Sequence, residues 1–316
     1  MDYIPLEKPL ADLEIRVEEL RRMEQTQALD CSQEIKSIER KISELITKTF
    51  SSLSPYDTVQ LSRHPRRPNT KELIELMGAS FTELHGDRNF YDDQAIVGGL
   101  ATLDGHSLVI IGHQKGRGTK ENILRNFGMP KPEGYRKALR LMSLAERFQL
   151  PILTLIDTPG AYPGIGAEER GQSEAIGKNI LVMCRLRVPI ITIVIGEGGS
   201  GGALALGVAN RIHMMEHAVY SVISPEGCAS ILLKDARKAD EMASALKLTA
   251  SSALRLNLID SVIPEPLGGA HRDPEQMGKR LRILIGKELE ELSHLSGEEL
   301  SRTRVEKFMG MGLIEE

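Results

Sequence analysis

Two glycine-rich segments are the strongest candidates for chemistry in this sequence. The first is Asp157-Thr158-Pro159-Gly160-Ala161-Tyr162-Pro163-Gly164, and the second is Gly196-Glu197-Gly198-Gly199-Ser200-Gly201-Gly202-Ala203. Each follows an apolar run typical of a buried strand and precedes a predicted helix. Because glycine has no Cβ, a ligand can approach the backbone closely, and the first N–H groups of a helix have no partner inside the helix. Such donors suit an anion or a developing oxyanion.

The second segment also satisfies two short motifs that point elsewhere. A G-x-G-x-x-G pattern starts at Gly196, with Glu216 at a plausible distance for a ribose in a dinucleotide site. A G-x-S-x-G pattern surrounds Ser200, with His271 downstream, as in serine hydrolases. A short glycine-rich stretch matches such patterns easily, so both are weak alternatives. For a single loop of this kind, tight packing at a sheet corner would be the favoured explanation.

A basic loop supplies a third candidate. Lys115 and Arg117 stand next to glycines in the stretch Gly112-His113-Gln114-Lys115-Gly116-Arg117, in a chain whose net charge is −4. They predict a local positive field that suits a phosphate or a carboxylate. Solvated helix faces are the alternative explanation for the other cations that follow along the chain.

The cysteine pattern argues against a metal centre. Cys31, Cys184 and Cys228 are far apart, and no C-x-x-C pair is present, so we expect no metal in this chain. A sparse, odd number of cysteines favours a reducing compartment, the cytoplasm. We interpret Cys228 as a small buried thiol rather than a nucleophile, because no histidine is near it in sequence.

The elements that position these segments alternate between apolar strands and helices, which indicates an α/β layer architecture with strands buried on both faces. Strands are predicted at 95–113 (two, joined by an Asp104-Gly105 turn of type I′), Pro151–Asp157, Pro189–Gly196 and Ala218–Ile223. Helices are predicted at Pro132–Gln149, near 168–187, from about 199, and at 274–295, the last of them exposed.

The first fifty residues contain no glycine and many charges, a helical composition. Two apolar stripes, Leu10 to Leu20 and Ile35 to Leu45, predict a helical hairpin with Asp30 or Ser32 capping the second helix. Its role is open between a clamp on a partner chain and an arm packed on its own domain. Leu61–Pro68 has the proline-broken, basic composition of a linker.

Composition limits the function further. The pI near 6.1 makes nucleic acid an unlikely partner. No apolar run approaches the roughly 18 residues of a membrane span, so no membrane partner is expected. The first residues lack the apolar core of a signal peptide, which agrees with a cytoplasmic location.

Longer motifs along the chain resemble the alpha subunits of the acetyl-CoA carboxylase carboxyltransferase family. They are Ala95–Gly99, Gly112–Arg117, Asn126–Pro130, Pro132–Ala138, Asp157–Gly164, Gly166–Gln172, Gly196–Ala203, Ser221–Cys228 and Ile263–His271. The resemblance extends to about residue 295. It departs from the family pattern at Gly118, where a longer, often acidic residue is usual, and this weakens only what is inferred for that loop.

The resemblance implies a crotonase-type fold, in which ββα units spiral into a core. It implies an N-terminal helical hairpin over 1–55, a carboxyltransferase domain over 56–295 and a C-terminal tail over 296–316. The activity implied is transfer of the carboxyl group of carboxybiotin to acetyl-CoA, which gives malonyl-CoA for fatty acid synthesis. The partners implied are a beta subunit, in an α2β2 complex, the biotin carboxyl carrier protein and biotin carboxylase. Biotin would be attached to the carrier protein and not to this chain.

For individual residues, the resemblance implies a backbone oxyanion hole at Gly201 and Gly202. It also implies substrate contacts from a wider set, namely Gly160, Ala161, Gly198, Gly199, Ala203, Lys115 and Arg117. We expect any side chain at Gly202 to enter the space that the biotin ring needs.

Three alternatives remain open. Within the same fold, the chain could be a self-sufficient enoyl-CoA hydratase or isomerase, with Glu168, Glu169 or Glu197 as acid and base. It could be a hydrolase that uses Ser200, or a scaffold without catalytic residues that positions a catalytic beta subunit.

Overall fold

A single eight-stranded sheet forms the centre of the computed structural model, which describes residues 3–27 and 29–312. The spatial order is β1-β2-β3-β4-β5-β6-β8, and β7 pairs with the end of β5. The strands are β1 (Ser80–Glu83), β2 (Ile96–Leu103), β3 (His106–His113), β4 (Ile152–Thr158), β5 (Ile190–Gly199), β6 (Arg211–Met215), β7 (Val219–Ser221) and β8 (Ser261–Ile263).

The sheet changes direction at β3. The first three strands form an antiparallel meander, and the strands from β3 onward run parallel. The predicted tight turn between β2 and β3 is confirmed, because Asp104 and Gly105 have φ angles of 50° and 84°, as a type I′ turn requires. All seven residues of β4 are buried, as are the first nine of the ten in β5. This explains why their sequences are continuously apolar rather than alternating.

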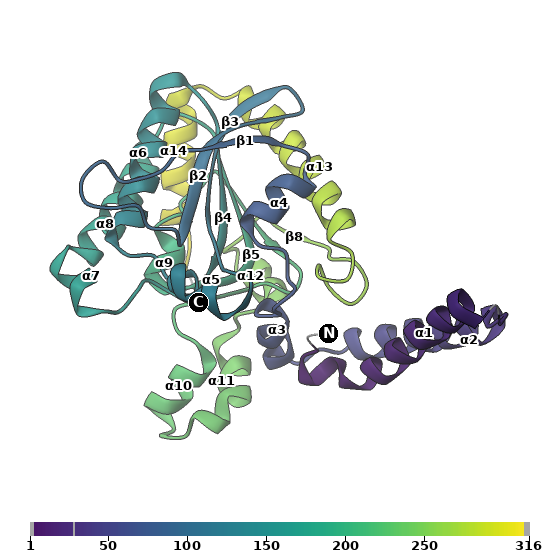
Figure 1. Ribbon diagram of the computed structural model, residues 1–316. Helices are drawn as coiled ribbons and strands as arrows, with labels where there is room; N and C mark the ends of the chain where they lie inside the picture. The colour runs from purple at the N-terminus through teal and green to yellow at the C-terminus, as the bar shows by residue number, and fades with distance from the viewer. Residues whose placement is uncertain (1–2, 28, 313–316) are drawn as a thin grey trace.

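Helices cover both faces of the sheet. In Figure 1, α6, α8 and α14 lie on one side of the strands, and α4 and α13 lie on the other. The α-helices are α1 (Lys8–Gln27), α2 (Ser32–Phe50), α3 (Pro55–Ser62), α4 (Thr70–Leu76), α5 (Gly118–Leu124), α6 (Pro132–Phe148), α7 (Ile165–Glu169), α8 (Gln172–Arg185), α9 (Ser200–Leu204), α10 (Pro225–Leu232), α11 (Ala239–Leu246), α12 (Ala250–Arg255), α13 (Pro274–Ser293) and α14 (Gly297–Met309). Among the described residues, no helix is both long and apolar enough to cross a membrane.

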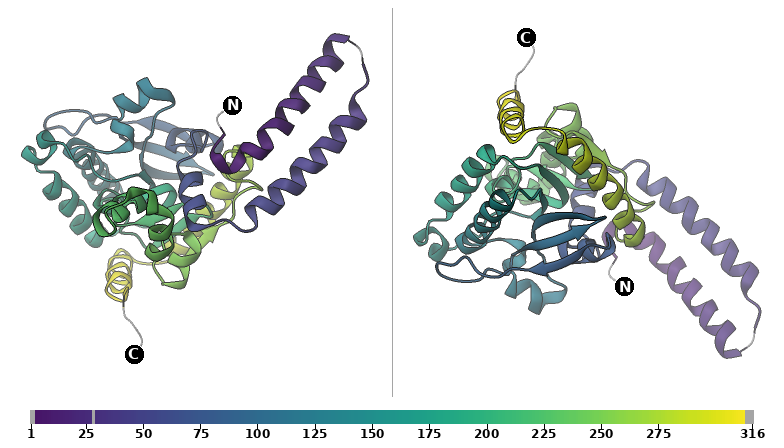
Figure 2. Two further views of the ribbon diagram at one scale, coloured as in Figure 1. Left: turned by 90° about the horizontal axis from the view of Figure 1, so that it is seen from below. Right: turned by 90° about the horizontal axis from the view of Figure 1, so that it is seen from above.

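The predicted N-terminal hairpin is present as α1 and α2, which stand away from the body as a long arm (Figure 2). Val17, Leu20 and Ile35 are buried between the two helices. The Asp30 carboxylate accepts the Ser32 N–H at 3.1 Å, but the N-cap residue itself is Cys31. Residues 1–2 and 28 lie outside the described part.

The predicted linker at Leu61–Pro68 is wrong. His64 and Arg67 within it are 3% and 5% exposed. The Arg67 guanidinium donates to the carbonyl of Ile195 at 2.6 Å and pairs with the buried Glu265 carboxylate at 2.5 Å. The segment is therefore part of the core, and it connects the base of the hairpin to the end of β5.

The C-terminal prediction also needs correction. The helix α13 is not exposed along its length, since Met277, Leu281 and Ile285 are fully buried. The stretch expected to be a tail contains α14, whose Arg304 is 0% exposed. The Arg304 guanidinium donates to three main-chain carbonyls at 2.6–2.8 Å and to the side chain of Asn210. The packed domain thus continues beyond residue 295, while residues 313–316 lie outside the described part.

Candidate active site

The two glycine-rich segments meet at the carboxyl ends of neighbouring parallel strands. The first follows β4 and the second completes β5, and Thr158 pairs with Gly198 between them. A Cβ on Gly199 would lie 2.2 Å from the carbonyl oxygen of Pro159, which is too close for any side chain. The glycine therefore allows the two backbones to touch, at the edge of the sheet where α/β proteins bind their ligands.

The turn into α9 presents free donors. The helix begins at Ser200, and its N-cap residue, Gly199, has no side chain with which to cap the first N–H groups. Within the described chain, the N–H groups of Gly201 and Gly202 donate no hydrogen bond, as expected for the first turn of a helix. The Ala161 N–H on the facing loop likewise has no partner among the described residues. These three unpaired donors are the candidates in this structure to hold a ligand with negative charge.

Gly202 faces the other loop rather than open space. A Cβ on Gly202 would lie 2.7 Å from the Ala161 nitrogen and 2.7 Å from the Gly160 carbonyl carbon. This corrects our expectation that a side chain at Gly202 would enter the ligand space, because it would instead push the two loops apart. A Cβ on Gly201 would meet only the side chain of Ile176, at 3.7 Å, which is an ordinary contact.

The other glycine-loop residues that we predicted to bind substrate are mostly buried. Gly198 lies inside β5 against the ring of Tyr220, Ala203 is 0% exposed, and Gly160 is also buried, with φ at +151°. They shape the backbone of the two loops, and their contact with a substrate stays a prediction.

Two polar side chains lie below the Gly202 turn. His113 and Tyr135 are both 0% exposed. The Tyr135 hydroxyl is 3.0 Å from the position that a Cβ on Gly202 would occupy. Burial lowers the pKa of His113 to about 3, although the nearby backbone of Gly202 opposes this shift. His113 is therefore a neutral imidazole at physiological pH, and the two side chains lie buried next to Gly202.

Lys115 does not present a free charge to a ligand. Its ammonium lies 2.7 Å from Asp157 Oδ1 and 2.7 Å from Glu197 Oε2. Burial alone would lower the pKa of Lys115, but these two carboxylates outweigh burial and raise it. Glu197 also accepts from Arg63 Nε at 2.6 Å. Burial would raise the pKa of Glu197, but the two cations lower it, so Glu197 is held ionised and is poorly suited to act as a general acid.

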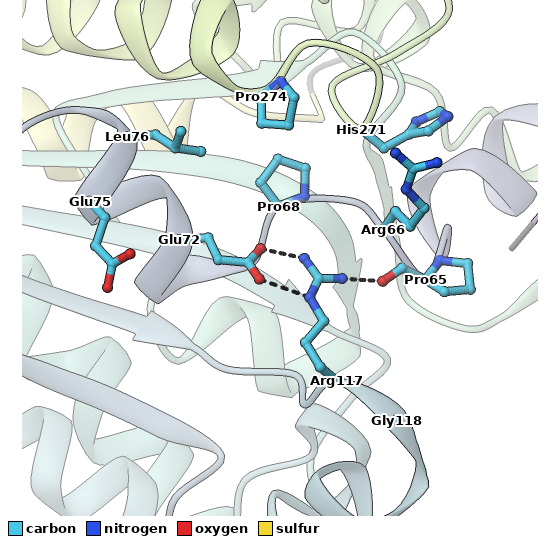
Figure 3. Close-up of a pocket in the computed structure, with 10 residues that line it drawn as sticks. All are labelled: Pro65, Arg66, Pro68, Glu72, Glu75, Leu76, Arg117, Gly118, His271 and Pro274. Atoms are coloured by element: carbon cyan, nitrogen blue, oxygen red, sulfur yellow. Dashed lines mark hydrogen bonds and ion pairs between the residues drawn. The ribbon is translucent and has the colours of Figure 1, made fainter. Parts of the chain in front are cut away.

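Arg117 is likewise paired within the chain. Figure 3 shows its guanidinium turned toward Glu72 and the carbonyl of Pro65, at the edge of a cleft of about 650 Å³. Its Nε donates to Glu72 Oε1 at 2.8 Å. Both Lys115 and Arg117 are thus paired with carboxylates of this chain, and their contact with a substrate stays a prediction.

Ser200 has the backbone of a strained turn but no catalytic base. Its φ angle is 52°, and it lines a pocket of about 400 Å³ whose other lining residues include Leu204, Val222 and Phe308 but no histidine, aspartate or glutamate. His271, the partner that the hydrolase pattern needs, lies instead at the base of the hairpin, where its Nε2 is 2.8 Å from a Glu7 carboxylate oxygen. The geometry does not support a Ser200 hydrolase.

Glu7, His64 and His271 form a buried cluster with the side-chain types of a metal site. The two imidazole rings stack with centroids 3.9 Å apart, and each Nε2 lies within 2.9 Å of a Glu7 oxygen. However, His64 Nδ1 accepts the backbone N–H of Arg66, which places the ring proton on Nε2. A metal would need the lone pair of Nε2. The cluster is therefore a hydrogen-bonded clasp that holds the hairpin to the body.

Sequence reasoning missed Asp157, Glu197 and Arg63 as a connected group. Asp157 and Glu197 end or nearly end the two strands that lead into the glycine segments, and Lys115 follows the end of β3. A charged residue at or just after the end of each of three adjacent strands was a signal in the sequence that these charges could meet. Arg63 lies 134 residues from Glu197 along the chain, and no local pattern links them.

Solved structures of a transcarboxylase, a carboxylase subunit and a decarboxylase share this fold. It superposes on transcarboxylase 12S with a TM-score of 0.55 and 21% identity, covering 68% of this chain and 39% of that one. The beta subunit of P. aeruginosa geranyl-CoA carboxylase superposes with a TM-score of 0.57 and 19% identity, covering 78% of this chain and 46% of that one. A chain of a Pseudomonas malonate decarboxylase hetero-tetramer superposes with a TM-score of 0.55 and 19% identity, covering 70% of this chain and 86% of that one. These similarities confirm the predicted crotonase-type fold.

The sequence comparison is more specific. The family model described as acetyl co-enzyme A carboxylase carboxyltransferase-like matches residues 3–312. The acetyl-coenzyme A carboxylase carboxyl transferase subunit alpha of Methylococcus capsulatus is 57% identical over 100% of this chain and 98% of its own length. That of Thioalkalivibrio sulfidiphilus is 55% identical over 98% of each chain. The chain belongs to this family of carboxyltransferase alpha subunits.

Proposed function

We propose that this chain is the carboxybiotin half of an acetyl-CoA carboxylase carboxyltransferase. The observation that carries the proposal is the set of free N–H groups on Gly201 and Gly202, at the junction of two loops on adjacent strand ends. Their glycine backbones allow close approach by a planar ligand. The family membership supplies the reaction class.

Biotin, attached to its carrier protein, supplies the carboxyl group and, after releasing it, a base for the methyl proton of acetyl-CoA. Release of carbon dioxide leaves negative charge on the ureido oxygen. The role of this chain is to donate hydrogen bonds to that oxygen from fixed positions. Each such donor lowers the barrier by about 3–4 kcal/mol in comparable sites. No general base from the protein is needed in this scheme.

The beta subunit completes the site in this proposal. It would hold acetyl-CoA and the enolate of its thioester, while the present chain holds biotin. We propose an α2β2 complex that receives carboxybiotin from the carrier protein after biotin carboxylase has acted. The three cysteines are all unpaired, which agrees with work in the reducing cytoplasm.

The rival enoyl-CoA hydratase has less support. Its best-placed acid, Glu197, is tied to Lys115 and Arg63, and Glu168 and Glu169 are exposed on the short helix α7. Unpaired N–H groups occur at the start of every helix, so the non-catalytic scaffold has to be separated from the proposal by experiment.

Reconstitution with the beta subunit tests the proposal. We expect the two chains to co-elute from a sizing column and to decarboxylate malonyl-CoA in a reaction that requires free biotin. The present chain alone is expected to be inactive. Turnover of malonyl-CoA by the purified chain alone, or by the complex without biotin, would contradict the proposal.

A further inference from the structure

A charged bridge ties together three strand ends below the glycine segments. Lys115 follows β3, Asp157 lies near the end of β4, and Glu197 lies near the end of β5. The Lys115 ammonium is within 2.7 Å of both carboxylates, so the two carboxylates must also lie close to each other. The Lys115 side chain is 22% exposed and the acids are 8% and 11% exposed.

The bridge is coupled directly to the main chain of both loops. Asp157 Oδ1 also accepts the Glu197 N–H at 2.9 Å. A Cβ on the neighbouring Gly196 would lie 2.4 Å from the same oxygen, so the Asp157 carboxylate fills the space that a side chain would take. Beyond this point the two loops pack backbone against backbone, at Gly199 and Pro159 and at Gly202 and Ala161. Any change in the spacing of the acids is passed to those contacts.

Other charged groups surround the bridge. Arg63, just after α3, pairs with Glu197 and also with Glu226 on α10 at 2.7 Å. The Tyr56 hydroxyl on α3 bonds to Glu226 at 3.2 Å. His113 on β3 is neutral. With Lys115 in place, two cations face three carboxylates, so the group carries one net negative charge. Without Lys115, Arg63 alone faces them, and Asp157 retains no cationic partner among the described residues.

From this geometry we infer that Lys115 is a positioning residue: its ammonium sets the separation of the two glycine loops and thereby the placement of the Gly201 and Gly202 donors. This inference rests on the proposed function of those donors. It replaces the predicted role of Lys115 as a cation that binds substrate.

The inference makes a distinctive prediction for pH. In Lys115→Met, Asp157 and Glu197 repel each other when both are ionised, and the loops spread. As pH falls, one carboxylate takes up a proton, and the two can then share it in a hydrogen bond. The turnover of the variant relative to wild type is therefore expected to rise as pH falls from 8 to 6. A residue that mattered only for packing would leave this ratio constant.

The experiment measures kcat and both KM values for biotin-dependent malonyl-CoA decarboxylation by the reconstituted complex at pH 6, 7 and 8. We expect Lys115→Met to lower kcat about 100-fold at pH 8, the usual scale for a catalytic group displaced by about 1 Å. The KM for malonyl-CoA is expected to stay unchanged. At pH 6 we expect the loss of kcat in Lys115→Met, relative to wild type, to be at least tenfold smaller than at pH 8.

Two further variants provide controls. Lys137→Met removes another buried lysine, whose ammonium pairs with Asp92 at 2.6 Å on the α6 side of the domain, and we expect it to lower the melting temperature without changing kcat. In Lys115→Met/Glu197→Gln only one acid of the bridge remains, so the rise at low pH is expected to disappear. A Lys115→Met deficit that is independent of pH, or an equal loss of kcat in Lys137→Met, would overturn the inference. An inactive wild-type complex would instead count against the proposed function.

Discussion

Replacing Gly202 with alanine adds a single methyl group at the junction of the two loops. That methyl carbon would lie 2.7 Å from both the Ala161 nitrogen and the Gly160 carbonyl carbon. Favourable contacts between such atoms are about 3.5–4.0 Å. The neighbours are backbone atoms, which cannot rotate away as a side chain could, so the loops must separate by roughly 1 Å.

The magnitude follows from this displacement. In the proposed function, the Gly201 and Gly202 N–H groups act on charge that develops in the transition state. Misplacing them by about 1 Å is then expected to cost about 100-fold in kcat. That corresponds to about 2.7 kcal/mol of barrier. Some loss of thermal stability is also expected, since the methyl group overpacks a buried site and such changes cost about 1–3 kcal/mol.

The assay is steady-state malonyl-CoA decarboxylation with free biotin in the reconstituted complex, with thermal melts and sizing chromatography on the same samples. Gly177→Ala is the matched control, because a Cβ on this α8 glycine would meet nothing within 4 Å. Alanine there is expected to leave kcat unchanged and to stabilise the helix by roughly 0.5–1 kcal/mol. If Gly202→Ala assembles and keeps more than half of wild-type kcat, the assignment of the donors is refuted.

Two further predictions concern Ser200 and His113. Ser200→Ala is expected to change kcat less than threefold, because the hydroxyl has no base beside it; a loss of several powers of ten would restore the hydrolase interpretation. His113 has a pKa of about 3 in the folded chain and about 6.5 when unfolded, so its contribution to stability is full above pH 6.5 and is lost as pH falls toward 3. Between pH 7 and pH 5 we expect it to lower the free energy of unfolding by about 2 kcal/mol, and urea denaturation of His113→Gln is expected to show a correspondingly flatter pH dependence. Equal slopes in the two proteins would contradict this assignment.

Much of the sheet could be predicted because its signals are local. The continuous apolar runs of β4 and β5 predicted buried strands, and Asp104-Gly105 predicted the turn between β2 and β3. The glycine segments were recognisable for the same reason, since strand, glycine and helix start lie within a few residues. The helical hairpin was predicted from a local signal as well, because its apolar residues recur at the 3.6-residue period of a helix.

The errors arose where a residue's partner is distant in sequence. Arg67 gave its segment a linker-like composition, yet its partner Glu265 lies 198 residues away. The tail over 296–316 was predicted because the resemblance ended near residue 295. The structure instead anchors α14 through Arg304, whose guanidinium donates to carbonyls 116–121 residues away. For the same reason, the sequence did not reveal that Lys115 pairs with Asp157 and Glu197. The direction in which a Cβ on Gly202 would point depends on the packing of two loops, which no spacing in the sequence reveals.

The most direct test of the account is transfer of labelled carboxyl groups. Biotin carboxylase, the biotin carrier protein, ATP and radioactive bicarbonate would generate carboxybiotin, and the beta subunit and acetyl-CoA would be added with or without this chain. We predict radioactive malonyl-CoA only when this chain is present, and about 100-fold slower labelling with Gly202→Ala. Labelling without this chain, or labelling at the wild-type rate with Gly202→Ala, would contradict the account.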